Sequence, residues 1–299
     1  MKKHYRSVGL GKLCRLFGKS RQAFYDHSWR RDDEGMQVAL IIDLVRSVRK
    51  TLPKVGTAKL LYMLKEDFSA HKILIGRDSF FKLLRKHDLL VKRKKRFVRT
   101  TMSNHHFKKW PDLTESISIT AIEQLWVSDI TYLTTQNGFI YLSLITDVYS
   151  RKIVGYHLSQ YLKAQGCLIA LHKAISSLRV DATVIHHSDR GIQYCCDAYI
   201  ETLQNNNIAV SMTQSGSPYD NAIAERINGI LKTELNLDKS FVNYSTAIPV
   251  VHQAIDAYNR LRPHMSCGNL TPETAHKQTG LLIKKWKPKK YCKAKSVLL

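Results

Sequence analysis

The feature that most constrains the fold is a change of hydrophobic period near residue 123. Before it, apolar residues recur every three or four positions, as in helices. After it come three extended segments, "LWVSDITYLTT", "FIYLSLITDVYS" and "KIVGYHLS", the first two joined at an Asn137-Gly138 hairpin signal. Helices at about 164–178, 197–206 and from Pro218 to about Leu235 then alternate with the strands "ATVIHHSD" and "IAVSM". This order predicts an α/β domain with a mixed sheet flanked by helices.

The first third of the chain reads as all helical. "GLGKLCRLFGKSRQAFYDH" predicts a short helix, a turn at Gly18 and a second helix capped by Ser20. Leu13, Leu16 and Phe17 fall on the short helix, and the second helix is expected to carry Ala23 and Phe24 inward. This is the outline of a helix-turn-helix, which would present Lys19, Arg21 and Gln22 to DNA. Any small helical hairpin has a similar pattern, so the alternative stays open.

Charge is unevenly distributed along the chain. The net charge is +23, but the excess lies in residues 1–110 and 284–299, whereas the middle of the chain is slightly acidic. Two basic flanks favour a polyanionic partner such as double-stranded DNA, and the alternative is a highly soluble surface. The densest run is Lys92, Arg93, Lys94, Lys95 and Arg96.

These patterns predict five parts. They are a helix-turn-helix (1–35), a second helical DNA-binding region (36–90), a basic linker (91–115), an α/β core (116–280) and a basic C-terminal tail (281–299).

Cysteine usage and apolar run lengths restrict the cellular context. The six cysteines have no CxxC spacing, which argues against zinc and against a disulfide framework. Neither a membrane span nor a secretory signal is recognisable. We therefore expect a cytoplasmic protein with no membrane partner.

Three carboxylates fall at positions where α/β folds place chemistry. Asp129 shares a strand face with apolar residues, Asp189 follows the strand that ends in "HHSDRGIQY", and Glu225 lies on a later helix. Taken singly, Asp189 could be a metal ligand, an acid or base, or a turn residue. If the fold brings the three together, their oxygens suit Mg²⁺ or Mn²⁺, and two such ions can support in-line phosphoryl displacement.

Longer stretches carry a family resemblance. The stretches "WVSDITYL", "GFIYLSLITDVYSRKIVGYHL", "HHSDRGIQY", "SMTQSGSPYDNAIAERINGILKTEL" and "YNRLRPHMSCGNLTPETA" resemble OrfB-type transposases of the bacterial IS-three group. The cores of that group are similar to retroviral integrases and have an RNase H-like fold with a DDE triad. Between Asp189 and Glu225 lie 35 residues, the interval of this group, and Lys232 matches its downstream basic position.

The resemblance implies a function as well as a fold. Asp129, Asp189 and Glu225 would hold two Mg²⁺ or Mn²⁺ ions, and the protein would bind terminal inverted repeats and target DNA as a dimer or larger homo-oligomer. It would act at the bacterial nucleoid, alone or with an OrfA partner or fusion. Beside Asp189, Arg190 and Gln193 are placed to contact substrate DNA. The rival hypotheses are a catalytically inactive DNA-binding relic and a structure-specific nuclease.

Neighbouring polar residues have structural readings. His186 and His187 should point to opposite faces of their strand, one packed in the core and one near the site. We expect Asp147 to serve a turn or to support the site from behind the ligands. Asp220 and Asn221 should cap or orient the Glu225 helix, and Arg260 and Arg262 should be available to DNA.

Overall fold

The computed structural model describes residues 8–91, 107–114, 117–179, 182–214, 221–283 and 285, without the side chains of residues 30–34. The chain divides into two compact units. A helical unit comprises residues up to 51 and 55–92, and a core unit comprises residues 52–54 and the chain from 93 onward. Each is described by itself.

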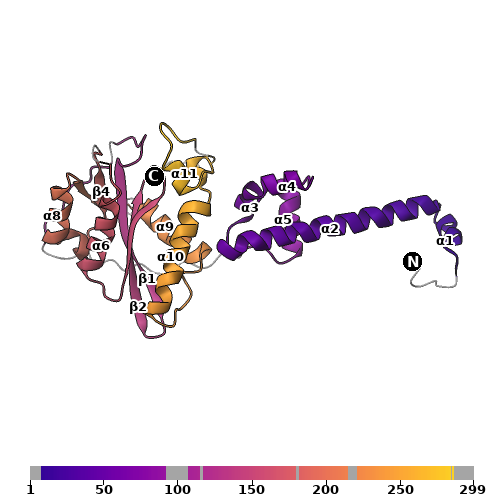
Figure 1. Ribbon diagram of the computed structural model, residues 1–299, viewed down its shortest axis with the longest axis horizontal. Coiled ribbons are helices and arrows are strands. Elements are labelled where there is room, and N and C mark those ends of the chain that lie inside the picture. The colour runs from indigo at the N-terminus through magenta and orange to yellow at the C-terminus, as the bar shows by residue number, and fades with distance from the viewer. Residues whose placement is uncertain are drawn as a thin grey trace, which may run out of the picture. The chain divides into compact units, whose positions relative to one another are not determined.

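The helical unit is all helical in its described part, as predicted. Its helices are α1 (Leu10–Leu16), α2 (Arg21–Thr51), α3 (Thr57–Met63), α4 (Lys65–Ala70) and α5 (Arg77–Lys86) (Figure 1). The helix α2 continues through the boundary that we placed between residues 35 and 36. A glycine inside a helix costs only about 1 kcal/mol relative to alanine, so Gly35 alone does not end it.

The start of the chain confirms the predicted turn but not the predicted packing. Gly18 has a positive φ of 62°, and the Ser20 hydroxyl accepts a hydrogen bond from the Ala23 amide at 3.0 Å. Leu13 is buried, whereas Leu16 and Phe17 are exposed, and the expectation that Ala23 and Phe24 face inward is wrong because both are exposed. Because α1 has only seven residues, it buries little of α2. The helix-turn-helix therefore remains a prediction.

A small core joins the second half of α2 to α3–α5. Ile41 and Val45 of α2, which are four residues apart and so share a helix face, are buried together with Leu60, Leu84 and Phe80. The Phe80 ring meets Phe68 edge to face, with centroids 5.8 Å apart. Burial of these side chains explains why this part folds compactly.

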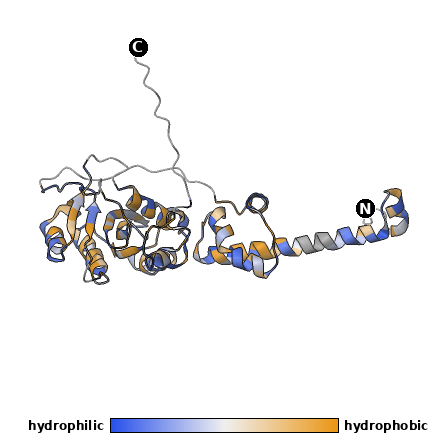
Figure 2. Cartoon of the chain, turned by 90° about the horizontal axis from the view of Figure 1, so that it is seen from above, coloured by the Kyte–Doolittle hydropathy of each residue, from blue (hydrophilic) through white to orange (hydrophobic). Residues whose placement is uncertain are grey.

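The core unit contains the predicted mixed sheet. Its strands are β1 (Leu125–Thr135), β2 (Gly138–Asp147), β3 (Ile153–Ser159), β4 (Ile185–Ser188) and β5 (Ala209–Met212). They lie in the order β3-β2-β1-β4-β5. The strand β2 pairs antiparallel with both β1 and β3, whereas β4 is parallel to β1 and β5 is parallel to β4. The strands carry long hydrophobic stretches, coloured orange in Figure 2.

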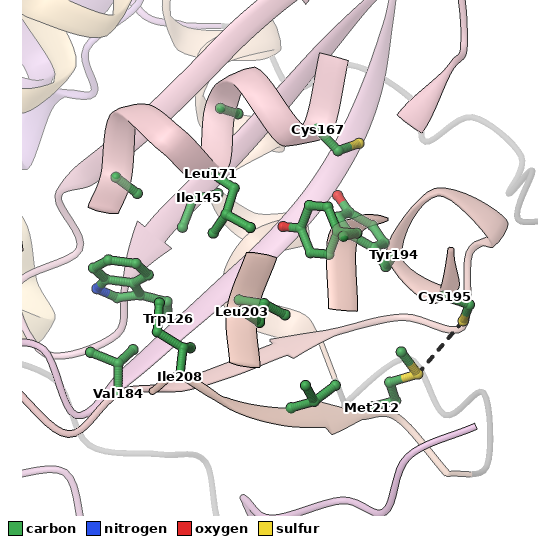
Figure 3. Packing of buried hydrophobic residues seen from close by; sticks show 14 residues of the cluster. Trp126, Ile145, Cys167, Leu171, Val184, Tyr194, Cys195, Leu203, Ile208 and Met212 are labelled. Atoms are coloured by element: carbon green, nitrogen blue, oxygen red, sulfur yellow. Dashed lines mark hydrogen bonds between the residues drawn. The ribbon is translucent and has the colours of Figure 1, made fainter. Parts of the chain in front are cut away.

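Helices cover both faces of this sheet, which completes the RNase H-like architecture. One side has α6 (Ala164–Ile175), α7 (Ile192–Cys195) and α8 (Asp197–Asn205), and the other has α9 (Ala222–Glu234), α10 (Tyr244–Leu261) and α11 (Pro272–Ala275). A cluster around Trp126, Leu171 and Leu203 fills the first interface (Figure 3). The predicted helix start at Pro218 and the predicted cap residue Asp220 lie outside the described residues.

The described part of the predicted linker belongs to the core unit. Within residues 107–114, Phe107 and Trp110 pack against the Trp126 cluster. The core therefore begins before residue 116, where we had placed its boundary. Residues 92–96 and 286–299 lie outside the described part of the chain. In the part that is described, no helix has both the length and the apolar composition needed to cross a bilayer.

A buried ion pair ties the end of α9 to the end of α10. The Arg262 guanidinium donates two hydrogen bonds to the Glu234 carboxylate, both of 2.8 Å, and its side chain is 2% exposed. The expectation that Arg262 contacts DNA is therefore wrong. Arg260 differs, because its side chain is 65% exposed where it pairs with Asp256.

We predict that Glu234→Gln lowers the free energy of unfolding by about 3–5 kcal/mol, because it leaves a buried guanidinium without its counter-charge. Asp256→Asn, which breaks the exposed pair with Arg260, should change it by about 1 kcal/mol or less. Urea unfolding of both variants checks this, and equal losses would contradict it.

Candidate active site

Strand pairing places the first two carboxylates side by side. The parallel register pairs Trp126 with His186 and Val127 with His187. Continuing that register by two residues sets Asp129 of β1 beside Asp189, which directly follows β4. Both side chains are partly buried. Adjacent strands lie about 4.8 Å apart, so the two carboxyl groups face the same small volume.

The third carboxylate is carried by α9, which two asparagines fasten to β1. Asn221 Nδ2 donates to the Ser128 carbonyl at 2.8 Å, and Asn228 Nδ2 donates to Asp129 Oδ2 at 2.7 Å. Glu225 lies between these two anchors, on the first turn of the helix. Asn221 orients the helix as predicted. Asn228 was missed, although its position one turn after Glu225 was a readable signal.

Burial is the largest influence on the pKa values of Asp129 and Asp189, and the like charges of the cluster add to it. Burial, the charge of Asp189 and, to a smaller extent, the charge of Glu225 together raise the pKa of Asp129 to about 7, against the lowering effect of hydrogen bonds from Asn228 and from the Ile130 amide. Burial and Glu225 also raise the pKa of Asp189, although a hydrogen bond from the Gly191 amide lowers it. The three carboxylates are therefore within electrostatic range of one another.

The donor set fits a hard divalent cation. All three groups supply carboxylate oxygens, which Mg²⁺ and Mn²⁺ prefer. Among the described residues, no three acidic, histidine or cysteine side chains already stand close enough to share one ion. Mg²⁺ commonly uses one or two carboxylates and keeps several waters, so a closed cage is not required.

Lys232 lies two turns after Glu225 on the same helix. Burial lowers the pKa of its ammonium, whereas the charge of Asp129 raises it. The Lys232 side chain is thus within electrostatic range of Asp129, where its positive charge offsets part of the acidic crowding.

The residues after Asp189 shape the rim of this site. A Cβ at Gly191 would lie 2.9 Å from Asp189 Oδ1, so any larger residue there would press on the carboxylate. Gln193 Nε2 donates to the Leu162 carbonyl at 3.4 Å, and Arg190 is partly buried beside Asp189. Gly191 therefore keeps the turn tight enough for Asp189 to stay at the end of β4.

Neighbouring polar residues have structural roles. His186 Nε2 makes hydrogen bonds with the hydroxyls of Ser128 (2.6 Å) and Tyr199 (3.0 Å), and burial lowers its pKa to about 3. His187 Nδ1 bonds to the Ser211 hydroxyl of the next strand at 2.8 Å. Asp147 accepts hydrogen bonds from Ser150 in a turn, as predicted.

Apart from Arg260 and Arg262, the other residues predicted to contact DNA fall in the helical unit or outside the described residues. Lys19, Arg21 and Gln22 are exposed in the helical unit. The run from Lys92 to Arg96 lies outside the described residues. The carboxylate site as described therefore comprises Asp129, Asp189 and Glu225, with Asn228, Lys232, Arg190 and Gly191 around them.

We predict that Asp129→Asn becomes more stable relative to wild type as the pH rises from 4 to 8 in a chelating buffer. The pKa of this carboxyl is raised from 3.8 to about 7 by folding, so its ionisation costs stability progressively across that window. Asp147→Asn, which loses buried hydrogen bonds, should be destabilised. Thermal denaturation at several pH values measures both, and a pH-independent difference for Asp129→Asn would contradict the prediction.

Comparison with known proteins places the chain in a family. Residues 120–218 and 206–272 match two family models that are both described as integrase core domain. A protein of insertion element IS600 from Shigella sonnei is 36% identical over 270 residues, covering 87% of this chain and 96% of that protein. The transposase InsF of insertion sequence IS3A from Escherichia coli (strain K12) is 28% identical and covers 91% of this chain and 96% of its own length.

A solved structure of the HTLV-2 integrase catalytic core domain in complex with magnesium covers 52% of this chain and 97% of its own, with 19% identity and a TM-score of 0.42. The two sequence relatives from insertion elements each cover nearly the whole of the present chain. This chain is therefore a member of the bacterial IS-three family of insertion-sequence transposases with an integrase core domain.

Proposed function

We propose that the protein is a DNA transposase that binds terminal inverted repeats, cleaves the DNA at them and transfers the ends to a target. The observation that carries the proposal is the convergence of Asp129, Asp189 and Glu225, from two paired strands and an anchored helix, within electrostatic range of one another. Membership of a transposase family agrees with it.

The three carboxylates would hold Mg²⁺ or Mn²⁺, in two ions, which supply charge stabilisation at the attacking and leaving oxygens of an in-line displacement. Asn228 holds Asp129 in place, and Gly191 leaves Asp189 room at the end of β4. Lys232 supplies a cation beside Asp129 for a DNA phosphate. In cleavage, water would attack phosphorus, and in joining, a DNA 3′-hydroxyl would attack a phosphorus of the target. In both steps the attacking oxygen gives up its proton, and the oxygen opposite the new bond leaves.

Further DNA contacts are assigned to the basic parts outside the carboxylate cluster. In the helical unit, Lys19, Arg21 and Gln22 stand exposed at the start of α2, and α5 exposes Lys82, Arg85 and Lys86. Residues 92–96 and the basic tail would add contacts to phosphates. Two DNA ends require a homo-oligomer on DNA at the nucleoid, and an OrfA product would act as partner or fusion.

The direct test uses a labelled duplex that carries the inverted repeats flanking the gene. Wild type with Mg²⁺ or Mn²⁺ should yield cleaved and joined DNA, and Glu225→Gln should lose both by about a hundredfold or more while it still binds. Glu201→Gln is the matched control, because Glu201 is an exposed glutamate on α8, across the sheet.

Two outcomes would replace the proposal. Hydrolysis without joining would indicate a structure-specific nuclease. Binding without cleavage by wild type would indicate a DNA-binding relic.

A second test needs no DNA. Mg²⁺ should raise the melting temperature of wild type and of Glu201→Gln, because a ligand that binds only the folded state stabilises it. The shift should vanish in an Asp129→Asn, Glu225→Gln double variant. Asn228→Ala should weaken Mg²⁺ binding by roughly 10–100-fold, because Asp129 loses the donor that orients it. Equal Mg²⁺ shifts in all four proteins would rule out this metal site.

A further inference from the structure

The segment 107–114 runs along the open edge of the sheet. β5 is the last strand at that edge. The Met212 amide donates to the Pro111 carbonyl at 3.2 Å, and the Leu113 amide donates to the Ser211 hydroxyl at 2.9 Å. The side chain of Trp110 packs against the core cluster. These contacts hold the segment against the core, although its sequence reads as linker.

This docking brings the segment close to the acidic site. Met212 pairs with Ser188, the residue before Asp189, and it also bonds to Pro111. Pro111 is therefore separated from Ser188 by one strand, which corresponds to about 10 Å at the usual strand spacing. Two residues before Pro111 stands Lys109, an exposed cation.

The charged side chains that act on the Cys195 sulfur show that Lys109 lies near Asp189 and Arg190. Cys195 Sγ lies 3.7 Å from Met212 Sδ, between α7 and β5 (Figure 3). Burial and the charge of Asp189 are the main causes that raise the pKa of Cys195 to about 11, against the lowering effect of Lys109 and Arg190. All three charged side chains are thus within electrostatic range of the same atom.

The two lysines of the segment differ in what they contact. Lys108 Nζ lies over the Trp110 ring, 4.3 Å from its centroid, which holds that side chain against the indole. Lys109 makes no salt bridge with an acidic side chain in the described part of the chain. Its charge is available to a ligand.

We propose that Lys109 and Arg190 form a phosphate-binding rim that holds the DNA backbone at the Asp189 side of the carboxylate site. This inference rests on the proposed function, since it names the contact that brings the DNA strand to that site. Three carboxylates repel a polyanion, and fixed cations beside them offset that repulsion where the strand must enter. The rim is part of the core unit, because segment 107–114 is bonded to β5.

The test is a site-directed cross-link in the full-length protein. Lys109→Cys is mixed with inverted-repeat duplexes that each carry a thiol tether on a single phosphate, and wild type gives the background from native cysteines. Lys239→Cys is the control. Lys239 is also exposed but lies two residues before Phe241, whose amide donates to the Thr134 carbonyl near the far end of β1, about 17 Å along the strand from Asp129.

We expect Lys109→Cys to form a disulfide with tethers next to the scissile phosphate at least about tenfold more efficiently than Lys239→Cys. Cross-linking at or below the control level at every tether position would overturn the proposal. Because the cross-link needs no catalysis, its formation with an inactive wild type would sustain the rim and refute the proposed function.

Kinetics give an independent readout. Lys109→Glu should raise KM for the DNA end about tenfold with little change in kcat. Lys109→Ala should reduce by about one the slope of log binding constant against log salt concentration, measured for DNA binding to the full-length protein. Neither substitution should alter the melting temperature, because the side chain is exposed. Cleavage by Lys109→Glu with wild-type KM would refute the rim and leave the proposed function standing.

Discussion

The parallel pairing of β1 with β4 is the constraint on which the candidate site depends. It brings Asp129 and Asp189 to the same level of the sheet, and the helix α9 then adds Glu225. Three acidic groups held this way repel one another, so the arrangement costs stability unless a cation is bound. The two asparagine anchors of α9 oppose that repulsion, because they join the helix to β1 on both sides of Glu225.

Stability for such a site has to come from elsewhere in the core unit. The buried pair between Arg262 and Glu234 closes the far end of α9 against α10, while the Trp126 cluster fills the opposite face of the sheet. A helix fixed at both ends and packed along its length keeps its acidic first turn beside β1. The same logic explains Gly191, where a side chain would displace Asp189.

Sequence patterns predicted the strands, their mixed pairing and the carboxylates, because period and turn signals are local. They did not predict contacts that depend on folded partners. Arg262 looked like a free cation until Glu234 was found beside it, and the position of Asn228 one turn after Glu225 does not by itself specify a bond to Asp129. Arg262 was expected to be exposed and is buried, whereas Phe24 was expected to be buried and is exposed. For Phe24, apolar character alone had suggested a packed helix pair.

Segment 107–114 shows why charge along a sequence is an incomplete guide to a binding surface. Its lysines belong to a run that reads as linker, yet Trp110 and Pro111 bind it to the sheet edge. A flexible cation contributes affinity wherever DNA passes, whereas a cation fixed on the core also defines where the backbone lies. In a core whose own charge is slightly acidic, a few fixed cations next to Asp189 would decide which phosphate reaches the carboxylates. The basic flanks would then supply most of the affinity for DNA, and the short rim docked on the core would align the DNA backbone with the carboxylates.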